Sequence, residues 1–151
     1  MKVDHNGLEV LDRGECLALL QTVPIGRIAI TVDALPVILP VNFVLAHDEI
    51  IMRTAEGAKL SAAMSHAVVA LEADHFEPFD HAGWSVLVQG NSRVIVDPTE
   101  LEATVELPLR SWASEQTDRY IAVSLDVVTG RRVRGWMDEH RFPSSVSRQI
   151  R

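Results

Sequence analysis

Three side chains that could bind a phosphate gather where a predicted strand ends and a predicted helix begins. Ile50–Thr54 is an apolar, β-branched run typical of a strand, and we expect a short helix from Ala58 to His66. Arg53, Thr54 and Lys59 therefore flank a helix N-terminus, whose unpaired N–H groups and partial positive charge favour an anion. One arginine and one lysine match a phosphate monoester of about −1.5 to −2 charge. We interpret this cluster as the phosphate end of a cofactor site.

An ordinary structural role stays open for each of the two cations. Arg53 could instead form a surface ion pair with Glu49 or Glu56, and Lys59 could be a solvated helix residue. The sequence alone does not decide between these roles and the phosphate site.

The strand before this cluster carries two prolines. Pro36–Leu45 is apolar, and Pro36 and Pro40 lie four residues apart, so both missing N–H donors point to the same side of the strand. A central strand would lose two ladder bonds there, so we expect a bulge, a solvent edge or a ligand on that side. The backbone around Val41 and Asn42 would then be able to bond a planar heterocycle, with a twisted edge that binds nothing as the alternative.

The remaining pattern predicts a mainly β fold, a six-stranded antiparallel barrel with short flanking helices and hairpin connections. We expect a bulge at Gly90 in the fifth strand, and Thr129-Gly130 to end the sixth. The six strands are expected at 28–32, 36–45, 50–54, 68–73, 83–96 and 119–128.

Capping boxes predict two of the helices and help to divide the chain. Asp12 with Glu15 predicts a helix over 13–22, and Asp97 with Glu100 predicts a short helix after the fifth strand. Residues 1–10 are expected to be a loose, flexible leader, residues 11–134 the domain, and residues 135–151 a basic C-terminal tail.

Composition excludes several classes of protein. A chain of 151 residues with a net charge of −7 is most simply one globular domain that does not bind nucleic acid generally. It has no apolar run that could span a bilayer and no signal-peptide pattern at its N-terminus, which predicts a cytoplasmic protein with no membrane partner. The single cysteine, Cys16, excludes an internal disulfide and a cysteine-based metal cluster. It lies on the apolar stripe of the first helix and is expected in the core.

One acidic segment resembles a metal site at first sight. Residues 74–84 fit no helix face and contain a proline, so we expect a solvated loop and predict no metal there. The candidate ligands would be Asp74, His75, Glu77, Asp80 and His81.

Several segments taken in order resemble one known family. A capped LDRGECLALL helix precedes GRIAI, PVILPVNFV, IIMRTAEGAKL, VVALEAD, GWSVLVQGNSRVI and VTGRRV. As a set, they resemble the pyridoxamine 5′-phosphate oxidase-like flavin-binding split-barrel family, in its short single-domain bacterial form. The resemblance covers about residues 8–134.

The resemblance implies a split β-barrel homodimer with flavin mononucleotide (FMN) in each of two interface clefts. By position, the phosphate ligands would be the residues of the cluster above, Arg53, Thr54 and Lys59. Along the isoalloxazine, mostly through backbone groups, would lie Val41, Asn42 and Phe43. A further flavin contact, from the partner subunit, would come from Trp84 and Ser85. Plain packing stays open for Trp84. Arg131 and Arg132 could reach the cofactor or a substrate.

The resemblance also implies a function, with alternatives. The first is an FMN-dependent oxidoreductase acting on a flat small-molecule substrate, in which the cofactor carries the chemistry. The C-terminal basic and histidine signature of the true oxidase is not matched around His140, which argues against oxidation of vitamin B6. The alternatives are a reductase that uses the deazaflavin F420 and a non-catalytic module that binds flavin or haem.

Overall fold

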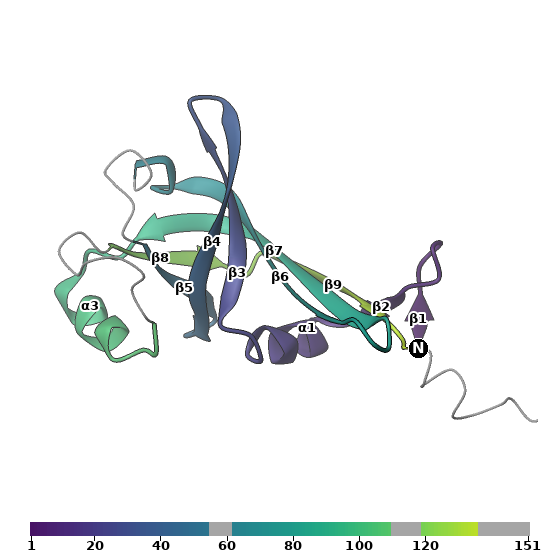
Figure 1. Ribbon diagram of the computed structural model, residues 1–151. Helices are drawn as coiled ribbons and strands as arrows, with labels where there is room; N and C mark the ends of the chain where they lie inside the picture. The colour runs from purple at the N-terminus through teal and green to yellow at the C-terminus, as the bar shows by residue number, and fades with distance from the viewer. Residues whose placement is uncertain (55–61, 110–118, 136–151) are drawn as a thin grey trace, which may run out of the picture.

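A computed structural model describes residues 1–54, 62–109 and 119–135, which contain nine strands and the helices α1 and α3 (Figure 1). The first half holds β1 Lys2–Val3, β2 Glu9–Leu11, α1 Arg13–Leu20, β3 Ile25–Val32, β4 Leu35–Ala46 and β5 Glu49–Thr54. The second half holds β6 Ala67–Glu77, β7 Ala82–Val94, α3 Pro98–Val105, β8 Arg119–Ser124 and β9 Val127–Val133.

Six of the strands close into an antiparallel barrel, as the sequence predicted. The ring runs β7-β6-β3-β4-β5-β8, and β8 pairs again with β7. These strands correspond to the six expected segments. Short hairpins explain the antiparallel order, because His47 and Asp48, for example, have φ of 53° and 58° and make the two-residue turn between β4 and β5.

One strand serves both the barrel and an extension of it. The Gly83–Gln89 half of β7 pairs with β9, whereas Ser92–Val94 pairs with β8. The change of partner falls at Gly90, where a Cβ atom would overlap the carbonyl oxygen of Ser124. The bulge expected at Gly90 is wrong, because β6 and β7 keep one unbroken register from Ala67↔Ser92 to Glu77↔Ala82. Glycine is needed for close backbone approach instead.

The sixth strand was also predicted wrongly as one piece. It is two strands, β8 and β9, separated at Leu125-Asp126, and Thr129-Gly130 lies inside β9 rather than after its end. The two pieces pair with different halves of β7. We call β9, with β2 and β1 laid beside it, the arm (Figure 1).

Two segments expected to be irregular contribute strands. In place of a loose leader, residues 1–10 contain β1 and the start of β2, which pairs with β9 through Glu9↔Arg132. The acidic segment is a loop only at residues 78–81, because β6 continues through Asp74 to Glu77. The partner of β2 is the distant strand β9, whereas Asp74–Glu77 pairs with Ala82–Ser85 directly across a short turn.

The proline-bearing half of β4 forms an edge, which is one of the predicted possibilities. In the described residues, Leu35–Val41 pairs with β3 alone, and pairing with β5 starts at Asn42. The turn between β3 and β4 has positive φ at Asp33 and Ala34, so Val32↔Leu35 is the hydrogen-bonded pair that closes it. Hydrogen-bonded and non-hydrogen-bonded pairs alternate along an antiparallel hairpin, so Pro36 and Pro40 occupy non-hydrogen-bonded pairs with β3. The N–H donors that these prolines lack would therefore face the open side of β4.

Two apolar clusters hold the helices against the barrel. The larger fills the barrel and takes Cys16 and Leu20 from α1. The helix has the predicted capping box, in which the Asp12 carboxylate accepts from the Glu15 N–H at 2.8 Å. The smaller cluster lies outside β5 and β8, beneath α3 and the chain after it, and includes Ile51, Ile95, Leu109 and Ala122. None of the described helices is long and apolar enough to cross a membrane.

Candidate functional site

The end of β5 brings two of the predicted site residues together. Asn42 on β4 is the direct cross-strand partner of Arg53, and Arg53 is the partner of Tyr120 on β8. Directly paired residues point to the same face, so these three side chains form one row outside the barrel.

Neighbouring groups fix the position of the Arg53 guanidinium. It lies 5.7 Å from the centroid of the Tyr120 ring, a cation–π distance, and its Nη1 donates to the carbonyl oxygen of Leu109 at 3.4 Å. The residue is half-buried, so the charge is held close to the surface rather than extended into water. This arrangement suits an arginine that receives an anion at the end of a strand.

Three other predicted residues have side chains on the opposite face. Val41, Phe43 and Thr54 are buried, and Val41 and Phe43 belong to the barrel core. Alternation along a strand explains this, since each adjoins Asn42 or Arg53. Only backbone groups of Val41 and Phe43 could then meet a ligand beside Asn42. Lys59 lies outside the described residues, together with the rest of 58–61 at the start of the helix predicted from Ala58 to His66. Of the described part, residues 62–63 are helical.

Trp84 and Ser85 also point to opposite faces of their strand. Trp84 packs against the barrel core on one side, in phase with Val86 and Val88, while Ser85 is exposed on the outer face. A ligand on one face of β7 can therefore meet only one of these two side chains. This half of β7 pairs with β6 and β9, and β5 pairs with β4 and β8, so the two parts of the predicted site occupy different regions of one subunit.

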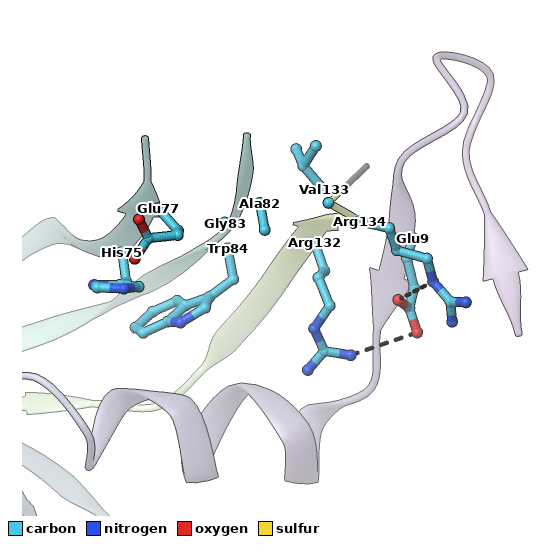
Figure 2. Close-up of a pocket in the computed structure, with 10 residues that line it drawn as sticks. Glu9, His75, Glu77, Ala82, Gly83, Trp84, Arg132, Val133 and Arg134 are labelled. Carbon is cyan, nitrogen blue, oxygen red and sulfur yellow. Dashed lines mark hydrogen bonds and ion pairs between the residues drawn. The ribbon is translucent and has the colours of Figure 1, made fainter. Parts of the chain in front are cut away.

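A hollow of about 550 Å³ opens beside Trp84, and we call it the arm hollow (Figure 2). Its walls come from β6, β7, and the β2 and β9 strands of the arm with the residues that follow β9. They include Glu9, His75, Glu77, Trp84, Arg132 and Arg134. The volume is typical of a small-molecule site. The sequence named Trp84 and Arg132 as candidates, but it missed His75, which it placed in a loop, and Glu9, which it placed in the leader.

Arg131 and Arg132 are divided between the faces in the same way. Arg131 donates through Nε to the Asp4 carboxylate at 2.8 Å and holds the pKa of that acid below its ordinary value. Arg132 lies on the other face, at the arm hollow. Only the second of the two arginines can therefore serve that space.

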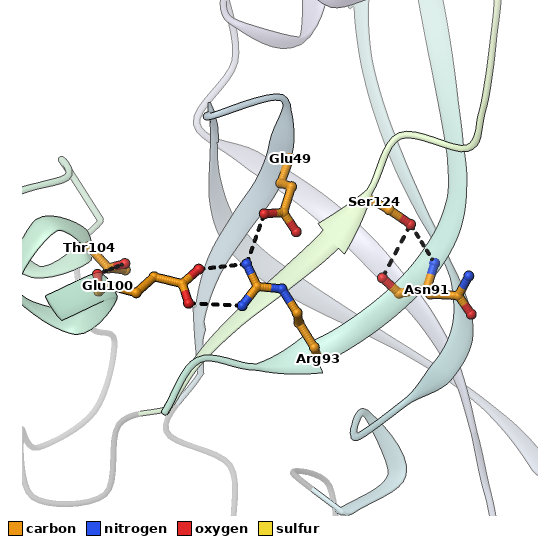
Figure 3. A network of polar contacts seen from close by, with 6 residues as sticks. All are labelled: Glu49, Asn91, Arg93, Glu100, Thr104 and Ser124. Atoms are coloured by element: carbon orange, nitrogen blue, oxygen red, sulfur yellow. Dashed lines mark hydrogen bonds and ion pairs between the residues drawn. The ribbon is translucent and has the colours of Figure 1, made fainter. Parts of the chain in front are cut away.

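A third arginine, at the barrel end of β7, is enclosed by carboxylates (Figure 3). Arg93 donates to Glu49 on β5 at 2.8 Å, and it contacts both carboxylate oxygens of Glu100 on α3. The hydrogen bonds from Arg93 hold the pKa of the Glu100 carboxyl below its ordinary value. We call these three residues the clamp, because they join α3 to the barrel.

The described residues contain no group of three or more His, Cys, Asp or Glu side chains that could hold a metal ion. Burial raises the pKa of the Cys16 thiol, which lies in the core under α1. That environment suits a packing residue rather than a nucleophile, as the sequence indicated.

A closed six-stranded antiparallel barrel, extended by an arm on one strand, defines the split-barrel class. Residues 12–132 match the family model described as pyridoxamine 5′-phosphate oxidase. The chain therefore belongs to the pyridoxamine 5′-phosphate oxidase-like family.

Known proteins similar to this chain include one curated relative and two solved structures. The uncharacterized protein Rv0080 of Mycobacterium tuberculosis is 38% identical over 82% of this chain and 84% of its own. The FAD binding protein of Mycobacterium smegmatis is 36% identical, with a TM-score of 0.73 over 83% of this chain and 98% of its own. A putative pyridoxamine 5′-phosphate oxidase of Corynebacterium glutamicum is 31% identical, with a TM-score of 0.75 over 84% and 98%.

Proposed function

We propose that this protein binds a flavin and acts as a flavin-dependent oxidoreductase on a flat small molecule. The observation that carries the proposal is the row of Asn42, Arg53 and Tyr120, in which an arginine is fixed at the end of β5. The family membership and the FAD-binding neighbour support the choice of a flavin over other phosphate-bearing ligands.

In this proposal the flavin phosphate is bound by Arg53 together with Lys59 and the Thr54 region. FMN and FAD both carry a phosphate on the ribityl chain, so the same groups would serve either cofactor. The isoalloxazine would lie along β4 beside Asn42, where the preceding stretch pairs, within the described part of the chain, with β3 alone. The bound flavin supplies the redox chemistry, and the chain binds and orients it.

A homodimer is the second part of the proposal. The outward face of β3, β4, β6, β7 and β9 carries a cross-strand row of Ile38, Ala29, Ala70, Gln89 and Val127. Ile38 is 68% exposed, and Val68 nearby on β6 is 77% exposed. An extended apolar face of this kind is covered most simply by a second copy of the chain. Ser85 is in phase with Gln89 on this outward face, so Ser85 rather than the Trp84 side chain would face the partner subunit.

Flavin titration of the full-length protein tests the proposal. FMN, FAD and F420 are added separately, and binding is followed by the change in flavin or deazaflavin fluorescence. Replacing Arg53 and Lys59 together by alanine should weaken flavin binding by about tenfold to a hundredfold, because each loses a charge-assisted contact to phosphate. Selective binding of F420 would move the protein to the deazaflavin alternative.

Arg13→Ala is the matched control, because Arg13 also donates from its guanidinium to a backbone carbonyl, that of Leu125. It should leave flavin affinity unchanged. Equal affinity in the double variant and the wild type would remove the phosphate assignment. Oxidation of a reduced nicotinamide by the flavin-loaded protein separates an oxidoreductase from a module that only binds the cofactor.

A further inference from the structure

A row of four side chains crosses four neighbouring strands beside the arm hollow. His75 on β6 is paired with Trp84 on β7, Trp84 with Arg132 on β9, and Arg132 with Glu9 on β2. Because direct partners share a face, the imidazole, indole and guanidinium groups follow one another in this order (Figure 2). The row spans about 14 Å from three strand spacings of about 4.8 Å.

A small residue leaves space beside this row. Glu77 on β6 is opposite Ala82 on β7, two positions further along the same face. The short Ala82 side chain stands between the longer Glu77 and the Arg134 that follows β9, and the hollow opens there. A flat ring fits such a space, because indole and imidazole offer planar surfaces for stacking.

At the other end of the row, Arg132 and Arg134 lie farther from their neighbouring carboxylates than in a close ion pair. Glu9 is the acid between them, 3.5 Å from Nη1 of Arg132 and 3.3 Å from Nε of Arg134, and Glu15 lies 3.6 Å from Arg132. Charge-assisted hydrogen bonds are usually about 2.7–2.9 Å long. A guanidinium has five N–H donors, so both arginines keep donors for an anion that approaches more closely.

We propose that the arm hollow binds a flat ring joined to an anionic group. The ring lies against Trp84 and His75, and the phosphate or carboxylate is bound by Arg132 and Arg134. The Glu77 carboxylate, at the opposite side of the hollow, accepts a hydrogen bond from a ring amino group. Within one subunit this site is separate from the Arg53 row, and its ligand binding is first tested without flavin.

Two molecules could supply this chemistry. One is the adenylate half of a dinucleotide flavin, and the other is a separate substrate with a ring and an acid. AMP is a probe for both, because it has a flat amino-bearing ring and a phosphate.

The test measures binding of AMP, adenosine and ribose 5-phosphate to the full-length protein without flavin, by titration calorimetry. AMP should bind at least tenfold more tightly than either of its two parts. Arg132→Gln should weaken AMP binding by about tenfold or more, because it removes a charged donor. Arg131→Gln is the matched control, on the next position of β9 but on the opposite face, and it should bind AMP as the wild type does.

Arg134→Gln is the second variant, chosen because its half-exposed side chain has less to contribute to folding. It should also weaken AMP binding without affecting adenosine. The proposal is overturned if AMP binds no more tightly than adenosine, or if the Arg131 and Arg132 variants lose affinity equally.

Flavin-loaded protein then distinguishes the two sources. If FAD prevents AMP binding and FMN does not, the hollow holds the adenylate half of the cofactor. If AMP still binds beside either flavin, the hollow serves a separate ligand of the same chemistry.

Discussion

The two ends of β7 use arginine in different ways. Arg93 at the barrel end and Arg132 beside the arm end have similarly exposed side chains, at 39% and 33%. Arg93 contacts Glu49 at 2.8 Å and both oxygens of Glu100, whereas the carboxylates around Arg132 lie 3.5 and 3.6 Å away. Exposure therefore does not separate a structural arginine from one that can receive a ligand, but the distance to its acids does.

The difference follows from what each half of the strand is paired with. The barrel half lies between β6 and β8, with α3 near enough to supply Glu100. The arm half is paired with β9, which ends at Val133 and leaves the hollow open beside it. One strand thus combines a closed framework with an open, polar surface.

Replacing the glycine between the two halves should have the largest effect. In Gly90→Ala the new methyl group would overlap the Ser124 carbonyl, so the backbone of β7 or of the β8–β9 junction must move. We expect a loss of about 3 kcal/mol or more in the free energy of unfolding, measured by urea denaturation.

Gly14→Ala serves as its control, because the nearest atom to the added carbon is Asp12 Oδ1 at 3.3 Å and the position is helical. It should leave the urea midpoint nearly unchanged. A Gly90 variant as stable as this control would show that the junction does not require glycine.

Removing the two arginines one at a time sharpens the comparison. Arg93→Gln should lower the free energy of unfolding by about 1–2 kcal/mol, because Glu49 and Glu100 lose their shared partner. Arg132→Gln should cost less than about 0.5 kcal/mol, as is usual for a long surface ion pair. Both losses are measured by thermal and urea unfolding. If the Arg93 and Arg132 variants lose the same free energy of unfolding, the distinction drawn from the distances is contradicted.

The clamp should also make stability depend on pH in the acid range. Arg93 lowers the pKa of Glu100 in the folded protein, so the unfolded chain takes up a proton first as the pH falls. The contribution is present above the ordinary Glu pKa of about 4.5 and is lost as the pH falls through the lower, folded value. Both partners are partly exposed, so we expect at most about 1 kcal/mol.

Comparison of urea midpoints at pH 7 and near pH 3.5 measures this contribution. The midpoint of the wild type should fall more steeply between the two pH values than that of Glu100→Gln, which cannot ionise at this position. Parallel curves for the two proteins would mean that Glu100 does not couple the clamp to protonation.

Much of the fold could be predicted because the barrel strands carry their own pattern. Apolar and β-branched runs identified all six, and the Asp12–Glu15 spacing identified α1. The split between β8 and β9 could not be seen, because it reflects a change of partner on β7 rather than a change in the alternation of residues 119–133. The strands near the N-terminus were missed for a similar reason, since β2 is paired with β9, more than a hundred residues away.

The candidate site was predictable only in the parts that are near in sequence. A strand followed by a helical run indicated Arg53 and Thr54, but which of them faces Asn42 depends on the register between β4 and β5. The row beside the arm hollow draws on four separate strands, so no local motif marks it. The complementary charges of Glu9 and Arg132 were the one available signal, and spacing gave no reason to pair them.

The prolines of β4 protect an exposed strand edge from pairing with another chain. Among the residues that the structure describes, Leu35–Val41 pairs with β3 alone, and its other side is an open strand edge with exposed apolar groups, Leu35 at 66% and Ile38 at 68%. Such an edge invites another chain to add a strand and begin aggregation. Pro36 and Pro40 remove two of the donors that an incoming strand would need. The hairpin can therefore remain apolar on its outer face while resisting growth into a larger intermolecular sheet.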